Sequence, residues 1–226
     1  MQQRSVLLSL LLVLLPAALF AQNDSTPKFF LGYSNLQAEG LPNKNNPNNV
    51  LSPEFIDRRS TLHGFNVEAT LPIRNFGITG DFSFNNAGKS VDVTSLTTQK
   101  TNTDIFYFVG GPSFTFRNQS RLQPFVRAMG GGARTNFKIS SKTDFASGTQ
   151  SNDFSTGSTD LAVMLGGGLD VRLNDKVQVR VFQMDYAPIF LGDRAIRVLG
   201  QTGAIQTVDL EGQRQDHIRF SFGVTF

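Results

Sequence analysis

The feature of this sequence that most constrains its fold is an alternation of apolar and polar residues with a period of two. Phe65 and Val67, for example, share one parity, whereas Asn66 and Glu68 share the other. Successive side chains of a β-strand point to opposite faces, so the pattern predicts strands with one apolar and one polar face. The helical spacing of apolar residues is not sustained anywhere in the chain. The sequence therefore predicts an all-β fold.

Eight segments show this alternation. Each has about the length that a tilted membrane strand needs, roughly 9–11 residues plus an overhang. The composition agrees, because the 21 Phe and 21 Gly suit strands that pack side by side around a barrel. The expected strands are residues 28–38, 61–73, 76–86, 103–117, 123–137, 159–173, 177–190 and 214–226.

The connections between these segments alternate in length. Three are short (74–75, 118–122 and 174–176), and four are long and polar (39–60, 87–102, 138–158 and 191–213). Outer-membrane barrels have short periplasmic turns and longer extracellular loops. The sequence therefore predicts an eight-stranded antiparallel up-and-down transmembrane β-barrel. Because the first connection is long, both chain ends are expected on the periplasmic side.

The direction of the two faces decides between a membrane barrel and a soluble one. A soluble lipocalin-like binder would turn the apolar set inward. Charged residues make up only 17% of this chain, and many of them fall in the connections. The polar faces are rich in Gly, Ser and Thr with isolated charges, which suits a crowded polar lumen better than a soluble surface. The apolar faces are therefore expected to face lipid.

Two segments fit this alternation less well. Arg127 shares a face with Phe125 and Met129, so that face is mixed. In the seventh segment the parity of the valines carries on to Gln183 and Asp185. A β-bulge near Phe182 would return both polar residues to the lumen.

The N-terminus predicts export. Arg4 precedes an apolar run from Val6 to Leu15, and small residues follow Pro16, so residues 1–21 are expected to be a cleaved signal peptide and 22–226 the barrel domain. A retained signal anchor is the alternative, although the run is short for a membrane span. The chain contains no Cys, which excludes a lipoprotein anchor and disulfides.

Charged residues of the polar faces are expected to meet inside the lumen. An eight-stranded barrel is just wide enough for side chains to fill it, and buried opposite charges must pair. Such a network either plugs the barrel or lines a gated ion path, and the small diameter favours the plug. The residues expected in the network are Glu68, Asp81, Arg127, Asp170, Arg172, Arg180, Asp185, His217 and Arg219.

No catalytic, cofactor or metal site is expected. The chain has two histidines and no cysteine, with no pair at ligand spacing. The runs Gly130–Gly132 and Gly166–Gly168 lack the context of a phosphate-binding loop, and strand bending explains them better. The near-balanced charge of +3 argues little for nucleic acid. Lys138 and Lys142 are expected either to be solvated or to meet lipopolysaccharide phosphates.

Several short motifs resemble those of the small OmpA-type and OmpX-type outer-membrane barrels, the porin-family outer membrane protein β-barrel domain. These motifs lie at residues 30–33, 77–82, 108–112, 124–127, 166–170, 183–186 and 219–226. In such proteins a terminal Phe after alternating apolar residues is read by the barrel assembly machinery, which implies this role for Phe222, Val224 and Phe226. Some eight-stranded relatives are lipid A deacylases, but their His-X-Ser arrangement is absent, since Arg219 stands where Ser belongs.

The expected function is therefore that of a monomeric, non-enzymatic outer-membrane protein of a Gram-negative cell. Its role is expected to be structural, or to be surface interaction through its extracellular loops. A narrow, low-conductance porin-like channel is the alternative. The expected partners are outer-membrane lipid, lipopolysaccharide and, during biogenesis, the assembly machinery.

Overall fold

The fold is all β, and the structure is a computed structural model. It describes residues 26–39, 59–73, 75–94, 97–116, 120–145, 148–174, 176–199, 205–210, 212 and 214–226. The expected signal peptide lies outside these residues. The strands are β1 (Lys28–Ala38), β2 (Ser60–Ile73), β3 (Phe76–Thr94), β4 (Thr97–Thr115), β5 (Leu122–Phe145), β6 (Gly148–Arg172), β7 (Gln178–Tyr186), β8 (Ile189–Phe190), β9 (Arg194–Leu199), β10 (Ile205–Leu210), β11 (Arg214–Gln215) and β12 (Ile218–Thr225).

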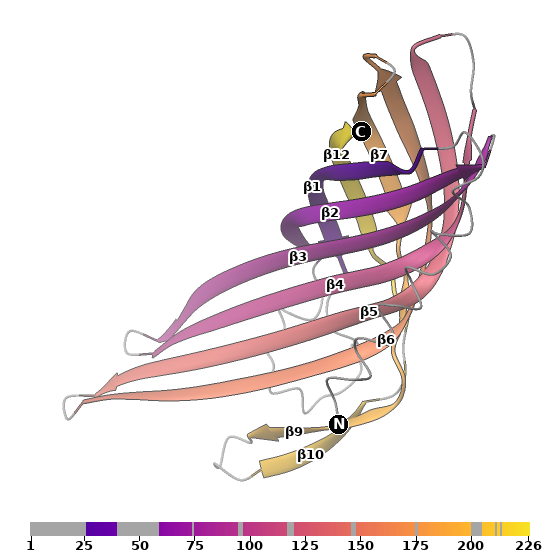
Figure 1. Cartoon of the computed structure of the whole chain (residues 1–226). Helices are drawn as coiled ribbons and strands as arrows, with labels where there is room; N and C mark the ends of the chain where they lie inside the picture. Colours follow the sequence, from indigo (N-terminus) through magenta and orange to yellow (C-terminus); the bar gives the residue numbers. More distant parts are fainter. Residues whose placement is uncertain are drawn as a thin grey trace, which may run out of the picture.

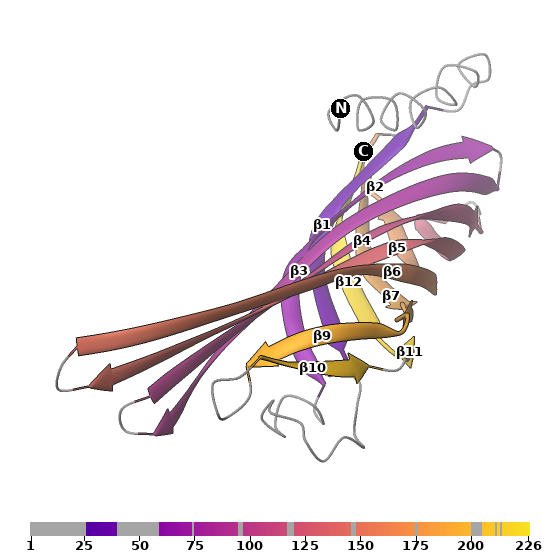
Figure 2. The ribbon, with the colours of Figure 1, turned by 90° about the horizontal axis from the view of Figure 1, so that it is seen from below.

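Eight of these strands close a barrel (Figures 1 and 2). Strands β1 to β7 pair antiparallel in chain order, and β12 pairs with both β7 and β1. The short strands β8 and β11 continue the wall at the end of β7 and the start of β12, and β9 and β10 form a separate hairpin. The predicted eight-stranded antiparallel up-and-down barrel is confirmed.

The start of β1 and the C-terminal residue meet at one end of the barrel. The backbone N–H of Phe29 donates to the carbonyl of Phe226 at 2.8 Å, and the N–H of Phe226 donates back at 2.9 Å. The three short connections lie at this same end, which we call the turn end, and the opposite end is the hairpin end. The short turns, the start of β1 and the C-terminal residue therefore lie at one end, as expected; that this end is periplasmic stays a prediction.

Three of the four expected long loops contain strands: the hairpin of β9 and β10 lies within residues 191–213, whereas residues 40–58 of the first expected loop lie outside the described residues. Most of residues 87–102 and 138–158 belongs to strands, because β3 and β4 stay paired to Thr94 and Thr97, and β5 and β6 stay paired to Phe145 and Gly148. Strands β4 and β5 also pair out to Thr97 and Thr143. The four strands therefore leave the barrel as one sheet, which sweeps far beyond it (Figures 1 and 2). Polar composition suggested loops here, but Thr and Val also favour extended backbone.

The expected bulge in β7 is confirmed. Gln183 pairs with Ser221 and Arg180 with Gly223, so two residues of β7 oppose one residue of β12. The two residues of the bulge, Val181 and Phe182, are both exposed on the outside. The bulge lets Arg180 and Gln183 both point inward although they are three residues apart.

Candidate functional site

The interior of the barrel is crossed by a chain of ion pairs centred on Arg219. This side chain has no exposed surface, and its Nη2 lies 2.6 Å from Asp81 Oδ2 and 3.0 Å from Asp185 Oδ2. Its Nη1 donates a second hydrogen bond to Asp81 Oδ1 at 2.9 Å. The alternation of β12 places Arg219 on the inner face, opposite Asp185 in the register.

Arg127 and Arg180 extend this chain toward the turn end. Arg127 contacts Asp185 at 2.8 Å and Glu68 at 2.6 Å. Arg180 Nη1 lies 2.6 Å from the other carboxylate oxygen of Glu68, and Arg180 Nε lies 2.8 Å from Asp170 Oδ1. Arg180 and Arg219 thus each bind two carboxylates and Arg127 contacts three, and the whole set is buried. Such pairing offsets the cost of burying the charges.

The structure brings seven of the nine expected lumen residues into this network, which we call the lumen network. They are Glu68, Asp81, Arg127, Asp170, Arg180, Asp185 and Arg219. Two expected members lie elsewhere. Arg172 is near the turn end, where its Nη2 donates to the Ser120 carbonyl at 3.5 Å. His217 is buried but hydrogen-bonds the neutral Tyr107 hydroxyl at 2.7 Å.

Two amide side chains that were not among the expected members also belong to the network. Asn66 donates to Glu68 at 3.0 Å, and Gln183 donates to Asp185 at 2.7 Å while accepting from Arg180 at 2.6 Å. Both residues share the inward parity of the charges that they bind. Parity places Asn66 on the polar face and the expected bulge places Gln183 in the lumen, but the expected network counted only charged residues and His217.

Sequence reasoning also missed an apolar layer at the hairpin end of the lumen. These side chains come from the inner faces of several strands, and the polar-lumen expectation is wrong for this layer. Its members are Leu36, Ala38, Leu62, Ile105, Tyr107, Val109, Met129, Ala133, Ala162, Met164, Ala187, Ile189 and Leu191. The layer fills the lumen on the hairpin-end side of the lumen network. The described interior is therefore closed by two successive layers, first the ion pairs and then the packed apolar side chains.

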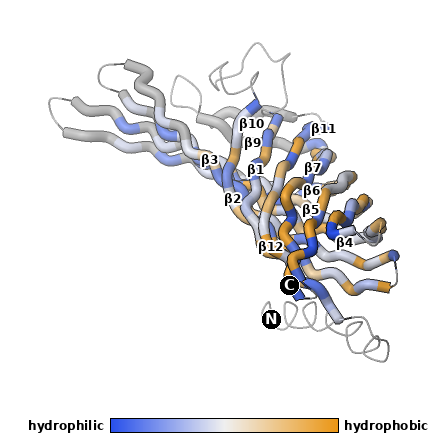
Figure 3. Tube along the Cα trace, turned by 90° about the horizontal axis from the view of Figure 1, so that it is seen from above, coloured by the Kyte–Doolittle hydropathy of each residue, from blue (hydrophilic) through white to orange (hydrophobic). Residues whose placement is uncertain are grey.

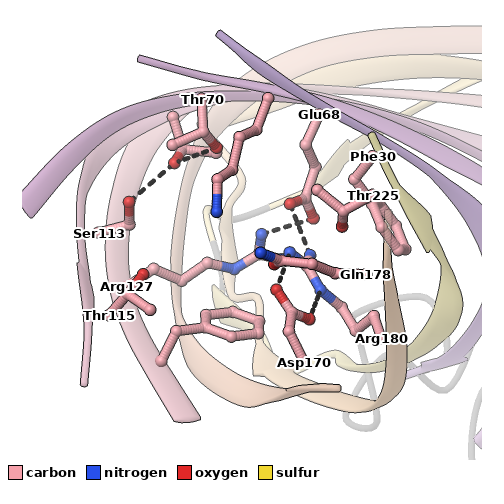
Figure 4. A pocket seen from close by; sticks show the side chains of 13 residues that line it. Phe30, Glu68, Thr70, Ser113, Thr115, Arg127, Asp170, Gln178, Arg180 and Thr225 are labelled. Carbon is pink, nitrogen blue, oxygen red and sulfur yellow. Dashed lines mark hydrogen bonds and ion pairs between the residues drawn. The ribbon is translucent and has the colours of Figure 1, made fainter. Parts of the chain in front are cut away.

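A small cavity lies on the other side of the lumen network (Figure 4). Its volume is about 40 Å³, and hydroxyl groups of Thr70, Thr79, Ser113, Thr115 and Thr225 contribute to its lining. The Arg180 guanidinium lies 4.2 Å from the ring centre of Phe30 and 4.3 Å from that of Phe125. The arginine is therefore held between two aromatic rings at the floor of the cavity.

The exterior of the barrel is apolar. Phe76, Ile78, Phe108 and Phe222 each expose more than half of their surface. Figure 3 shows hydrophobic segments along the barrel wall, whereas the described parts of the projecting sheet are mostly hydrophilic. A continuous apolar surface of this extent is a lipid-facing surface, not a water-facing one. The soluble lipocalin-like alternative therefore fails, because it requires the apolar faces inside.

Aromatic rings form two bands on this exterior. Near the turn end, Phe29 packs on Phe226 and Phe76 packs on Phe114, with ring centres 6.4 and 5.0 Å apart. Toward the hairpin end, Phe84 packs on Phe106 at 4.8 Å. Phe76 and Phe84 are eight positions apart on β3, so the two bands are separated by about 26 Å along the strand and about 19 Å across a membrane at 45° tilt.

A closed barrel with a lipid-facing exterior, aromatic bands and a buried network of ion pairs across its interior leaves one assignment. The fold is that of the small outer-membrane β-barrels. Among the residues that the structure describes, no helix is long and apolar enough to cross a membrane, and no group of His, Asp and Glu could hold a metal ion.

Comparison with solved structures returns other barrels. The attachment invasion locus protein Ail of Yersinia pestis matches with a TM-score of 0.45 and 14% identity, covering 88% of this chain and 97% of that chain. OprG from Pseudomonas aeruginosa gives 0.44 and 13%, covering 88% and 93%. The outer membrane protease OmpT from Escherichia coli gives 0.46 and 6%, covering 91% and 97%.

No protein-family model and no curated protein matches the chain. The expectation that this barrel is not an enzyme stays a prediction.

Proposed function

We propose that this barrel is an exported outer-membrane protein that binds other polypeptides through its projecting sheet. The observation that carries the proposal is the four-stranded sheet formed by the outer parts of β3 to β6. Residues 1–21 would direct export and be removed, the hairpin end would face the outside of the cell, and the barrel would act as a monomer. The assembly machinery would recognise Phe222, Val224 and Phe226 during insertion.

The edges of the projecting sheet support this role. Strand β6 pairs with β7 and β8 only from Leu161 onward, so its residues 148–160 have β5 on one side and no strand among the described residues on the other. The same holds for β3 beyond Asn86, where its pairing with β2 ends. An open strand edge presents N–H and C=O groups that an extended peptide can pair with.

The proposal is tested with a shortened barrel. Residues 88–101 and 138–155 are each replaced by Asn-Gly, which shortens both hairpins to near the rim while keeping the lumen network. The probe is a labelled twelve-residue peptide of alternating Thr and Val with terminal lysines. We expect the full barrel to bind it and the shortened barrel not to. A matched peptide with alternate N-methylated backbone amides should not bind either; equal binding of both peptides to both barrels contradicts the proposal.

The outward face of β5 supports a second contact, with lipopolysaccharide phosphates. Arg134 lies opposite Phe106 of the aromatic band, and Lys138 and Lys142 follow at four-residue intervals on the same face, all exposed. Cations just beyond the lipid-facing band lie at the depth of the headgroups. Replacing all three with Gln should lower the lipopolysaccharide that copurifies with the barrel, whereas replacing Lys176 at the turn end should not.

The narrow channel is the weaker alternative, because the lumen network and the apolar layer occupy the lumen in series. Planar-bilayer recording of the refolded barrel decides between them. We expect no ion conductance from the native chain. Steady single-channel currents that change when Arg180 is replaced with Ala would favour the channel over the plug.

A further inference from the structure

Nine buried side-chain atoms of the described residues have no hydrogen-bond partner, and eight of them lie on one wall. They belong to β1, β2, β3 and β12, with His217 directly before β12. The atoms of this wall are Ser34 Oγ, Asn66 Oδ1, Ser83 Oγ, Asn85 Nδ2, Asn85 Oδ1, His217 Nε2, Ser221 Oγ and Thr225 Oγ1. Buried polar groups are almost always paired with protein or with ordered water, so a cluster of exceptions on neighbouring strands calls for a common cause.

The register brings these groups into facing pairs. Ser221 lies opposite Ser34, and Asn66 lies opposite Ser83. Side chains directly opposite each other on antiparallel strands have Cβ atoms about 5 Å apart. The unpartnered atoms of each pair are not hydrogen-bonded to each other, and one water molecule can span the gap between them with two ordinary hydrogen bonds.

A glycine lies between two further unpartnered groups, those of Ser34 and Asn85. Gly64 of β2 lies opposite both Ser34 of β1 and Asn85 of β3. No side chain therefore stands between these two polar groups along the wall. Asn85 has both its amide nitrogen and its amide oxygen without a partner, so it needs a molecule that can both accept and donate. Water does both.

At the end of the wall nearest the hairpins, the hydrogen bonds of Tyr107 and His217 show that a hydrogen-bond donor is missing. The Tyr107 hydroxyl donates to the Ala187 carbonyl at 3.0 Å, so toward His217 Nδ1, at 2.7 Å, it can only accept. The neutral ring therefore carries its proton on Nδ1, and Nε2 is left as an acceptor without a donor. A water molecule supplies that donor.

We infer that this wall binds a file of ordered water molecules beside the lumen network. Along β12 the groups recur every four residues, at Thr225, Ser221 and His217, so they follow the lumen from the turn end toward the apolar layer. Thr225 also lines the cavity at the turn end (Figure 4), which gives the file its entrance. These water molecules hydrate a lumen that is closed to ions. The inference is independent of the peptide binding proposed for the projecting sheet.

The first test measures stability against urea for the mature barrel refolded in detergent. In Ser83→Ala and in Asn85→Leu, an unpartnered polar group is replaced by an apolar one of similar size. If the wall is dry, both changes raise the urea midpoint, because a buried unpaired group is removed. If the wall binds water, both lower it. Ser113→Ala is the control, since Ser113 already accepts from Thr79 and donates to the Gly77 carbonyl.

The second test observes the water directly, and it needs no variant. Nuclear Overhauser spectra of the ¹⁵N-labelled barrel should show long-lived cross-peaks from water to the backbone amides of Ser34, Ser83, Asn85 and Ser221. The amide of Val109, whose side chain lies in the apolar layer, should show none. Raised urea midpoints, or the absence of cross-peaks at all four amides, would overturn the inference.

Discussion

Arg219 shows how single residues hold the interior together. It lies opposite Asp185 in the register and reaches across the lumen to Asp81, so it ties β12 to β7 and to β3. Both carboxylates are themselves buried, and they also contact Arg127. Loss of one guanidinium would leave buried carboxylates with too little positive charge around them, which costs more than the pair itself contributes.

Replacing Arg219 with Met should therefore lower the free energy of unfolding by about 3–5 kcal/mol. The measurement is a urea titration of the refolded barrel, followed by the gel shift between folded and unfolded forms. Arg214→Met is the matched control, because its ion pair with Asp216 is exposed and should contribute little. Similar effects of the two changes would mean that the lumen network does not stabilise the barrel.

Phe226 tests a single residue of the exterior. Its deletion removes one aromatic ring from the turn-end band and, by family resemblance, the residue that the assembly machinery reads. The loss of burial alone is on the order of 2 kcal/mol. We expect the mutant to refold from urea in detergent but to accumulate poorly in the outer membrane of cells. Normal accumulation would mean that Phe226 is only another lipid-facing aromatic.

At the scale of elements, the bulge of β7 decides which residues enter the lumen. Val181 and Phe182 both face outward, and this shift of parity puts Arg180, Gln183 and Asp185 inside together. A regular strand would send either Arg180 or the other two residues into lipid, where a charge is costly.

Two single-residue deletions in β7 should therefore differ. Deleting Val181 removes the extra residue and leaves Arg180 and Gln183 facing inward on a regular strand. Deleting Met184 instead forces Gln183 or Asp185 outward. We expect the first mutant to refold and the second to fail, judged by gel mobility without boiling. Equal refolding of both would show that the bulge does not set the face of these residues.

At the scale of the whole molecule, closure is what makes the barrel stable in lipid. The eight-stranded wall leaves no free edge within the membrane, since β12 pairs with β1 along eight residues. Every backbone group of the wall can then be satisfied without water. Among the described strands, open edges lie in the hairpin of β9 and β10 and in the projecting sheet, which extends beyond the lipid-facing surface (Figures 1 and 3).

The refolded mature chain should therefore migrate differently on gels before and after boiling, and its circular dichroism should be dominated by strand. The closed wall keeps its shape in mild detergent until heat opens it. The shortened barrel described above should keep both properties, because its hairpins lie outside the closed wall. Identical migration with and without boiling, or a helical spectrum, would contradict the barrel.

The sequence by itself determined that eight strands form the barrel, which of their faces points outward, and that the short turns lie at one end. Alternation with a period of two is a local property, and the closed barrel turns it directly into an inner and an outer face. It also predicted the bulge, because Gln183 and Asp185 broke the parity of an otherwise apolar face.

Only the tertiary structure decided which inward residues meet and where the strands end. Asp81 and Arg219 are distant in the chain and form an ion pair only because the barrel closes. Arg172 has the same parity as Asp170, so the sequence alone could not show that it lies outside the lumen network. The outer halves of β3 to β6 are polar on both faces, so no alternation distinguishes them from loops. Their pairing depends on the neighbouring strand, which a single sequence segment does not reveal.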